Sequence, residues 1–318
     1  MKLAVADNNG RKFTNDLINH WEALGHEVHV EPGASEKLAQ WADIYYCDIW
    51  DNNIHYLYGL YNGDPGNSRA WMKDWDNNKK PFIVCRLLDW EVFLGLARDQ
   101  AMINWVNKAI CIAPHIEQKL RAENDWGDKL KLIRPGVNLE KFTLKTKETD
   151  GFQLGMVLGD EWKYKNLYGG LDIFTTLYQK DKRWRLHLRG QHENSMYDPV
   201  NFDYYLESRG IKDVVTHYSR VEDMNTWYEN IDILLHPGQK EAFCYAIGEA
   251  MAKGIPCVIN DFYGSHAIWP NGHLYKTHEE AINKIKSAIP NSTIRKYIED
   301  NYSLDRMIKE MDEWIGIR

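Results

Sequence analysis

Two glutamates stand at the ends of a nearly uncharged segment, KEAFCYAIGEAMAKGIPCVI, which runs from Lys240 to Ile259. The apolar run DILLHPG before it and Gly254 after it predict a helix with Glu241 at its entrance. A helix start offers unpaired backbone N–H groups and a positive dipole end, which together suit a diphosphate. Eight helical intervals would separate Glu241 from Glu249 by about 12 Å. The two acids would then contact different parts of one elongated ligand, although helix capping and solvation explain them equally well.

Short apolar runs alternate with segments of helical spacing along the chain, which indicates parallel α/β architecture. In the first half we expect strands at residues 2–9, 27–32, 42–50, 80–89, 108–114 and 129–136. In the second half we expect strands at residues 151–159, 184–190, 213–219, 232–238 and 255–260. Helices are predicted at residues 14–26, 166–180, 201–210, 224–231 and 242–254. In open sheets of this kind, ligands bind beyond the carboxyl ends of the strands.

The pattern of strands and helices restarts after a charged segment without a clear period, LEKFTLKTKETDG at residues 139–151. We place the linker there and predict two Rossmann-like domains, residues 1–145 and 146–301, with a cleft between them. Residues 302–318 carry apolar side chains at helical spacing. We expect that segment to pack back onto another domain.

The formal net charge of −7 is spread over both halves. Residues 1–145 hold 18 basic and 20 acidic residues, so −2, and the remainder holds 21 and 26, so −5. Neither half has the basic excess of a protein that tracks phosphate backbones. The 13 Trp and 18 Tyr suit sugar rings and nucleobases, and they are equally ordinary core material.

The five cysteines are scattered and odd in number, which fits a reducing compartment and argues against a disulfide framework or a structural zinc site. They are Cys47, Cys85, Cys111, Cys244 and Cys257. No apolar stretch of the sequence is long enough to span a bilayer, and the N-terminal apolar run is too short for a signal peptide. We expect a cytoplasmic protein and leave peripheral membrane contact open.

The segment HPGQKEAFCYAIGEAMAKGIPCVI resembles the Glu-x7-Glu signature of retaining, nucleotide-sugar-dependent glycosyltransferases of the GT-B fold, especially glycosyltransferase family 4. Four further segments resemble the family in the right order: NNGRKFTNDLINHWEALGHEVHV, LKLIRPGVNLEKF, LGMVLGDEWKYKNLYGGLDIF and VVTHYSRVEDMNTWYENIDILLHPG. The resemblance is strong after residue 130 and weak between residues 45 and 105. It implies two Rossmann-like domains facing a cleft, an N-terminal acceptor side, a C-terminal donor-binding domain and a final helix that crosses back to the first domain.

The resemblance implies a role for three charged residues. Glu241 matches the family's first glutamate, which lies by the donor sugar, and Glu249 matches the second, which holds the ribose hydroxyls. A carboxylate that accepts two O–H groups is well suited to that task. Lys165 matches the lysine at the donor diphosphate, where a cation would stabilise the charge that develops on the leaving phosphate.

Other donor-binding residues follow from the same resemblance. The matches cover the helix start whose amides face the phosphates (Phe243, Cys244, Tyr245), the loop along the nucleobase (Tyr218, Arg220, Val221) and the first glycine loop (Gly10, Arg11).

Two positions depart from the family pattern. Asp160 stands where the family usually has an arginine, so Lys163, Arg189 or Arg134 would have to supply that charge. Leu88 precedes Asp89 where the family often has His-Asp, which leaves Asp89 as a catalytic candidate.

We therefore expect transfer of a sugar from a UDP- or GDP-linked donor to an acceptor hydroxyl, with retention at the anomeric carbon. The donor is a co-substrate, and the resemblance implies no cofactor and no required metal. Glycans and lipid-linked glycans are the default acceptors. A hydroxylated DNA base, as in phage-type glycosyltransferases, and a non-catalytic nucleotide-sugar binder are the alternatives. The pattern does not identify the sugar, the acceptor or the oligomeric state.

Overall fold

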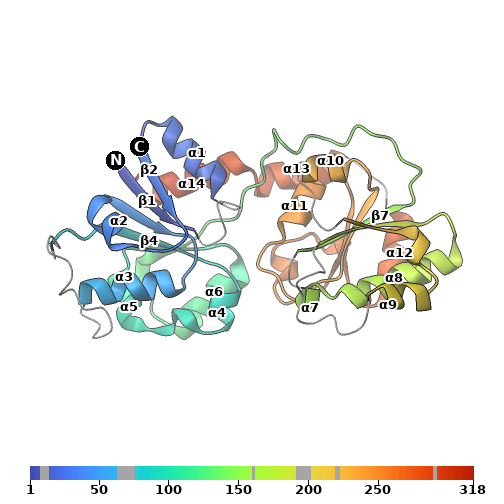
Figure 1. The fold of residues 1–318 in the computed structure, drawn as a ribbon, viewed down its shortest axis with the longest axis horizontal. Coiled ribbons are helices and arrows are strands. Elements are labelled where there is room, and N and C mark those ends of the chain that lie inside the picture. Colours follow the sequence, from blue (N-terminus) through green and yellow to red (C-terminus); the bar gives the residue numbers. More distant parts are fainter. Residues whose placement is uncertain are drawn as a thin grey trace. The chain divides into compact units, whose positions relative to one another are not determined.

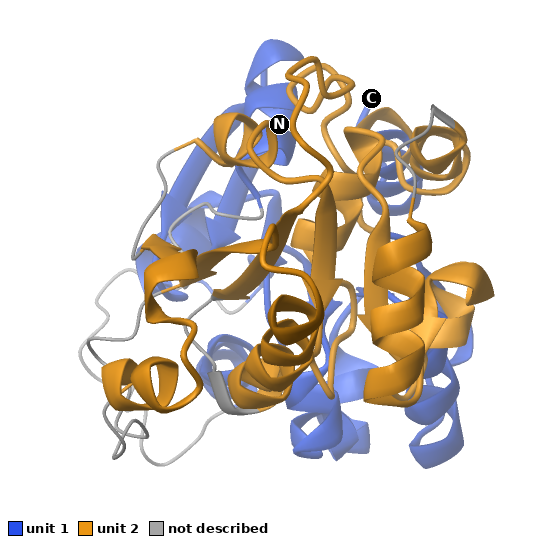
Figure 2. Cartoon of the chain, turned by 90° about the vertical axis from the view of Figure 1, so that its right-hand side faces the viewer, with its two compact units in different colours: residues 1–134, 307–318 blue, residues 135–306 orange. Residues whose placement is uncertain are grey.

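The computed structural model describes residues 1–7, 14–62, 76, 78–159, 162–190, 202–218, 223–288 and 292–318. The chain divides into two compact units, coloured separately in Figure 2. Unit 1 comprises residues 1–134 and 307–318, and unit 2 comprises residues 135–306. The boundary lies between Arg134 and Pro135. From the sequence we had placed it after residue 145.

Unit 1 is built on a six-stranded parallel sheet in the order β2-β1-β3-β4-β5-β6. Its strands are β1 (Lys2–Ala6), β2 (Glu27–Glu31), β3 (Ile44–Cys47), β4 (Phe82–Leu87), β5 (Lys108–Cys111) and β6 (Leu130–Leu132). Its helices are α1 (Asn15–Ala23), α2 (Glu36–Trp41), α3 (Asn52–Asn62), α4 (Trp90–Phe93), α5 (Gln100–Trp105), α6 (Pro114–Glu123) and most of α14 (Leu304–Ile315). Helices α1 and α14 cover one face of the sheet, and α3 to α6 cover the other (Figure 1).

Unit 2 repeats this plan with the strand order β12-β11-β10-β7-β8-β9, again all parallel. Its strands are β7 (Gln153–Gly159), β8 (Arg185–Gly190), β9 (Val215–Tyr218), β10 (Ile233–His236), β11 (Cys257–Asn260) and β12 (Leu274–Tyr275). Its helices are α7 (Trp162–Lys165), α8 (Leu167–Lys180), α9 (Phe202–Ser208), α10 (Met224–Tyr228), α11 (Tyr245–Ala252), α12 (His278–Ser287) and α13 (Ser292–Asn301). The predicted α/β class with two Rossmann-like domains is confirmed.

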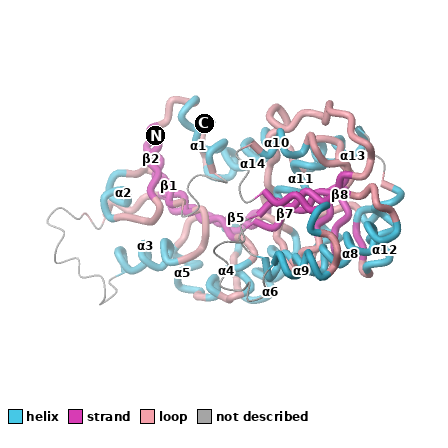
Figure 3. The backbone as a smooth tube through the Cα atoms, turned by 45° about the vertical axis from the view of Figure 1, so that its right-hand side comes forward, coloured by secondary structure: helices cyan, strands magenta, loops and turns pink. Residues whose placement is uncertain are grey.

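Helices cover both faces of each sheet, so the hydrophobic cores lie between the sheets and these helices (Figure 3). Strands β3 and β10 are buried along their whole length, as expected when helices cover both faces of a parallel sheet. The edge strand β2 is exposed at alternate residues. In unit 2 an apolar cluster joins the inner strands to α8 and includes Phe174 and Trp184.

The last helix, α14, packs onto unit 1 through one apolar stripe. Met307, Met311 and Ile315 are buried on that stripe. Asp312 lies beside α1, where its carboxylate is 2.7 Å from Nε2 of His20 and accepts a 3.0 Å hydrogen bond from Nε1 of Trp21. The C-terminal helix therefore closes the fold of the unit that the N-terminus began.

Two acidic residues of unit 2 bind the segment that we expected to be a linker, residues 139–151. The ammonium of Lys145 lies 3.1 Å from Asp232. The backbone N–H groups of Thr146 and Lys147 donate to Oε2 of Glu229 at 3.0 and 2.9 Å. These contacts explain why residues 135–151 belong to the second unit rather than forming a free connection.

Candidate functional site

The strand order of unit 2 reverses between β7 and β10. From β7 the chain proceeds through β8 to β9 on one side, and β10 starts the other side with β11 and β12. Ligands of doubly wound sheets bind beyond the carboxyl ends of the strands at this reversal. The segments that leave β7 and β10 carry Lys165 and Glu241, and these two side chains form an ion pair.

Backbone contacts hold the two segments together. The side-chain amide of Asn166 donates to the carbonyl of Pro237 at 3.3 Å, and the N–H of Gln239 donates to the carbonyl of Tyr164 at 2.9 Å. On the other side, the amide of Asn260 donates to the carbonyl of Gly238 at 3.0 Å. The Lys165–Glu241 pair therefore joins the last residue of α7 to the loop after β10, and these segments are fixed to each other and to β11.

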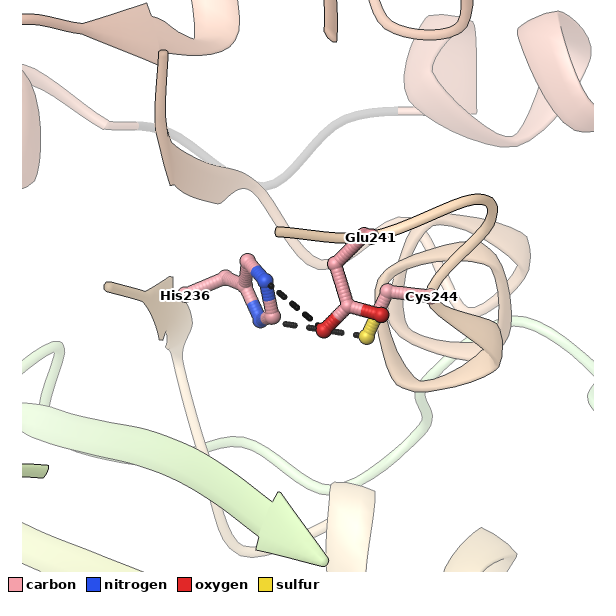
Figure 4. Close-up of side chains that lie close together, drawn as sticks. All are labelled: His236, Glu241 and Cys244. Carbon is pink, nitrogen blue, oxygen red and sulfur yellow. Dashed lines mark hydrogen bonds and ion pairs between the residues drawn. The ribbon is translucent and has the colours of Figure 1, made fainter. Parts of the chain in front are cut away.

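His236 and Cys244 complete a buried polar group around Glu241, shown in Figure 4. Nε2 of His236 lies 3.4 Å from Oε1 of Glu241, and Nδ1 lies 3.8 Å from Sγ of Cys244. Among the described residues, His236, Glu241 and Cys244 form the one group of side chains with metal-ligand spacing. The sequence analysis expected no metal and missed this group, because positions 236, 241 and 244 match no ligand motif.

The charges in this group shift one another. Burial raises the pKa of the Glu241 carboxyl, but the charge of Lys165 and the contact with His236 outweigh it and bring that pKa down to about 2. Burial lowers the pKa of His236, whereas Cys244 and Glu241 beside it raise that pKa to about 9. Glu241 is therefore a carboxylate at neutral pH with two cationic neighbours.

A separation of about 12 Å between Glu241 and Glu249 assumes a helix that begins at Glu241. Helix α11 begins four residues later. It starts at Tyr245 with Cys244 as its N-cap, and the N–H of Ile247 donates to the carbonyl of Cys244 at 3.0 Å. Glu241 lies in the preceding loop, so the interval from Glu241 to Glu249 is not helical throughout. The position of Glu241 is set by the loop contacts rather than by the helix.

Phe243 is a core residue. Its ring centroid lies 5.1 Å from that of Trp269 and 5.0 Å from that of Tyr302. A Cβ on Gly248 would lie 3.1 Å from the Phe243 ring and 2.9 Å from Val137, so α11 packs closely there. Phe243 thus anchors the helix start, and only its backbone remains a candidate for ligand contact.

Glu249 lies half-buried in the second turn of α11 and is held by α10. The hydroxyl of Tyr228 lies 2.9 Å from Oε2 of Glu249 and 3.1 Å from the carbonyl of Ala246. Burial raises the pKa of Tyr228 well above its ordinary value, so the hydroxyl is a donor. This contact fixes the carboxylate of Glu249 relative to the helix start.

The two donor-site candidates on β8 and β9 lie next to each other, since Arg189 pairs with Tyr218 in the sheet register. The hydroxyl of Tyr218 lies 3.1 Å from Nδ1 of His187, and the two rings are stacked. Nε of Arg189 is buried without a hydrogen-bond partner among the described residues. Arg134 lies at the boundary of the two units.

Some candidates cannot be placed. Gly10, Arg11, Arg220 and Val221 lie outside the described residues, as does Asp160. For Lys163, the structure describes the backbone within α7 but not the side chain.

In unit 1, charged residues follow the carboxyl ends of β3 and β4. Asp89 is the N-cap of α4 and makes no capping hydrogen bond with its side chain. Arg86 is buried, and its Nη2 donates to the carboxylate of the fully buried Asp48 at 2.8 Å. Arg86 therefore pairs with an acid of its own unit.

Glu91, next to Asp89, is a buried acid that the sequence analysis missed. Its Oε1 accepts a hydrogen bond from the N–H of Leu88, and its Oε2 has no hydrogen-bond partner among the described residues. Burial raises the pKa of the Glu91 carboxyl to about 7, although the Leu88 N–H works against that rise. In the sequence, the only sign of a role for Glu91 is its position two residues after Asp89, in RLLDWE.

Replacing Glu91 by glutamine is expected to change how the stability of unit 1 depends on pH. The folded-state pKa of about 7 lies above the ordinary value of 4.5, so the wild type loses stability as pH rises between these values. The full span corresponds to about 3 kcal/mol, and glutamine does not titrate. Urea unfolding at pH 5 and pH 8, followed by hydrogen exchange of β4 peptides, measures the difference. An unchanged difference between the two proteins at both pH values would contradict the buried titration.

Comparisons with known proteins place this site in a family. The family model described as "Glycosyl transferases group 1" matches residues 146–308. The O-antigen chain mannosyltransferase RfbU of Salmonella typhimurium is 23% identical over 204 residues, which are 59% of this chain and 53% of that protein. An uncharacterized glycosyltransferase of Haemophilus influenzae is 25% identical over 211 residues, 60% of this chain and 57% of the relative. The chain thus spans little more than half the length of these curated relatives.

A solved structure extends the likeness over the whole chain. The crystal structure of Anabaena Alr3699/HepE in complex with UDP matches with a TM-score of 0.70 and 14% identity, over 99% of this chain and all of that one. Together with the two parallel sheets, this likeness confirms the GT-B fold. No helix in the described part of the chain is long and apolar enough to cross a membrane.

Proposed function

The chain belongs to the group 1 glycosyl transferases, and from that premise we propose that it is a retaining, metal-independent glycosyltransferase of the family 4 type. It takes a sugar from a UDP- or GDP-linked donor and transfers it to an acceptor hydroxyl. Unit 2 binds the donor and unit 1 the acceptor, for which glycans and lipid-linked glycans are the first candidates.

The observation that carries this proposal is the Lys165–Glu241 ion pair at the strand reversal of unit 2. The two residues are 76 positions apart in the sequence, yet the structure pairs them. They lie where a doubly wound sheet binds its ligand. An ordinary surface lysine would have its ammonium in solvent, whereas the side chain of Lys165 is largely buried, with 20% of it exposed.

Each of the three charged residues matches one part of a nucleotide sugar. Lys165 and the start of α11 offset the charge of the diphosphate, because the helix start adds its dipole to the ammonium. Glu241 accepts hydrogen bonds from hydroxyls of the donor sugar. Glu249, fixed by Tyr228, accepts them from the ribose.

The reaction that fits this donor grip is front-side displacement. The acceptor hydroxyl attacks the anomeric carbon on the face that the diphosphate leaves, and the leaving phosphate takes the acceptor proton. Lys165 stabilises the charge that develops on that phosphate. Asp89, in unit 1, is the candidate for contact with the acceptor.

A donor screen by thermal shift tests the proposal. At 100 times its Kd, the matched nucleotide sugar stabilises the folded protein by about 2.7 kcal/mol, which raises the Tm by roughly 5–10 °C. UDP-glucose, UDP-galactose, UDP-N-acetylglucosamine and GDP-mannose are the first donors to compare. Chromatography of released UDP or GDP then separates turnover from the alternative of binding alone.

Two variants show whether the donor occupies the predicted place. Glu249→Gln is expected to weaken donor binding about 10- to 100-fold, because it removes the charge that the ribose hydroxyls contact. Glu279→Gln, at an exposed position on α12 of the same unit, is the matched control and should leave the shift unchanged. Equal shifts in both variants, or the absence of any shift with all four donors, would contradict the donor site.

A further inference from the structure

The group formed by His236, Glu241 and Cys244 has the dimensions of a metal site. One ligand atom from each residue lies within 4.8 Å of the other two. Zinc is held tetrahedrally at about 2.0–2.3 Å from nitrogen, oxygen and sulfur ligands, which separates neighbouring ligand atoms by about 3.3–3.8 Å. Nε2 of His236 lies 3.4 Å from Oε1 of Glu241, and Nδ1 lies 3.8 Å from Sγ of Cys244, so one of these contacts has to adjust for a single ring nitrogen to bind the ion.

The three ligands are held by rigid neighbours. His236 is the last residue of β10 and pairs with Ile259 of β11 in the sheet register. A Cβ on Gly238 would lie 2.6 Å from Nε2 of His236, so that glycine is needed to leave room for the ring. Cys244 is fixed as the N-cap of α11. The ring of His236 and the backbone of Cys244 are therefore in place before an ion binds, and Glu241 exchanges its pairing with Lys165.

The ligand types select the class of ion. Imidazole, carboxylate and thiolate together suit zinc and similar transition metals, whereas magnesium and calcium prefer oxygen ligands alone. Three protein ligands also leave a fourth tetrahedral position for water. We propose that His236, Glu241 and Cys244 bind a zinc-type divalent cation, and that the bound ion blocks the donor site.

The proposed block of the donor site follows from Glu241, because its carboxylate belongs both to the metal site and to the ion pair with Lys165. In the structure its carboxylate is paired with Lys165. An ion bound to that carboxylate places a second cation beside the ammonium, so metal binding and the Lys165–Glu241 pair compete. The blocking part rests on the proposed function, whereas the binding of the ion does not.

Zinc titration of the metal-free full chain, against a chromophoric zinc chelator, tests the site directly. We expect one equivalent of tightly bound zinc, with affinity lowered at least 10-fold in Cys244→Ser and in His236→Ala. Cys257→Ser is the matched control, because Cys257 is a buried thiol of the same unit outside the group, and it should bind zinc as the wild type does. No bound zinc, or unchanged affinity in both ligand variants, would overturn the site.

Cobalt(II) provides a readout that needs no variant. When cobalt replaces zinc in the wild-type chain, a thiolate-to-cobalt charge-transfer band is expected, and its absence would remove Cys244 from the site. Donor thermal shifts with and without zinc test the blocking part. Zinc that binds without reducing the donor shift overturns that part alone. If no donor binds to the metal-free chain, the proposed function fails, and the titration still decides the site.

Discussion

Replacing Lys165 by alanine is expected to lower kcat by about 10²- to 10³-fold, the usual consequence of removing one group that stabilises developing charge. The ammonium is the cation that the structure places on Glu241 at the strand reversal of unit 2. Without it, the leaving phosphate loses the ammonium and keeps the helix start as a positive partner. Steady-state kinetics with the donor found by the thermal-shift screen measure the effect, and KM should change less than kcat.

Two controls separate this role from a structural one. Lys240→Ala removes a cation next to Glu241 in the sequence, one that lies over the Tyr164 ring, and should change kcat little. Lys165→Arg keeps a cation at this position and should retain more activity than Lys165→Ala. Equal losses in the two variants would trace the loss to the shape of the side chain rather than to its charge. A fully active Lys165→Ala enzyme would refute the assignment outright.

The donor-side hypothesis could be formed from the sequence because its signals are close together. Glu241, Glu249 and the glycine that ends α11 lie within fourteen residues, and Gly254 has the positive φ of 75° expected after a helix. The start of α11 was misplaced because Ala242 and Phe243 continue the apolar pattern. Phe243 is apolar for a different reason, since it packs against Trp269 and Tyr302. That reason is visible only after the chain has folded.

The polar neighbours of Glu241 show a second limit of prediction from the sequence. The resemblance assigns Lys165 to the diphosphate, but it gives no sign that Lys165 lies beside Glu241. His236 stands before a Pro-Gly turn and looks structural in the sequence. In the structure the turn brings the chain back, so that Glu241 and Cys244 both lie within 3.8 Å of ring nitrogens of His236.

Two of the elements that were not predicted lack a clear local pattern. Strand β12 has only two residues, Leu274–Tyr275, too few to show a period. Helix α3 is rich in aromatic residues and lies in the region where the resemblance is weakest. In unit 1, the pairing of Arg86 with Asp48 depends on the register that sets Cys47 opposite Cys85. That register is a long-range property, so neither residue could be assigned a partner from its own surroundings.

Replacing Arg86 by methionine is expected to destabilise unit 1 by about 3–5 kcal/mol at pH 7.5, because it leaves the carboxylate of Asp48 buried without its cation. Asp48 is fully buried, and burial already raises its pKa to about 6 although Arg86 lies beside it. Its folded-state pKa lies above the ordinary value of 3.8, so stability is lost as pH rises through 6. Without Arg86 the pKa rises further, so the loss should be smaller at pH 5, where Asp48 takes up a proton.

Hydrogen exchange of peptides from β3 and β4, measured over a urea series, reports on unit 1 separately from unit 2. The double variant Asp48→Asn, Arg86→Met removes both charges and should recover part of the loss, since contacting residues are not additive. A single variant with unchanged exchange at pH 7.5 would show that the ion pair is dispensable. A double variant no more stable than the single one would trace the loss to the packing of the Arg86 side chain. The pH dependence separates these causes, because lost packing does not recover when Asp48 is protonated.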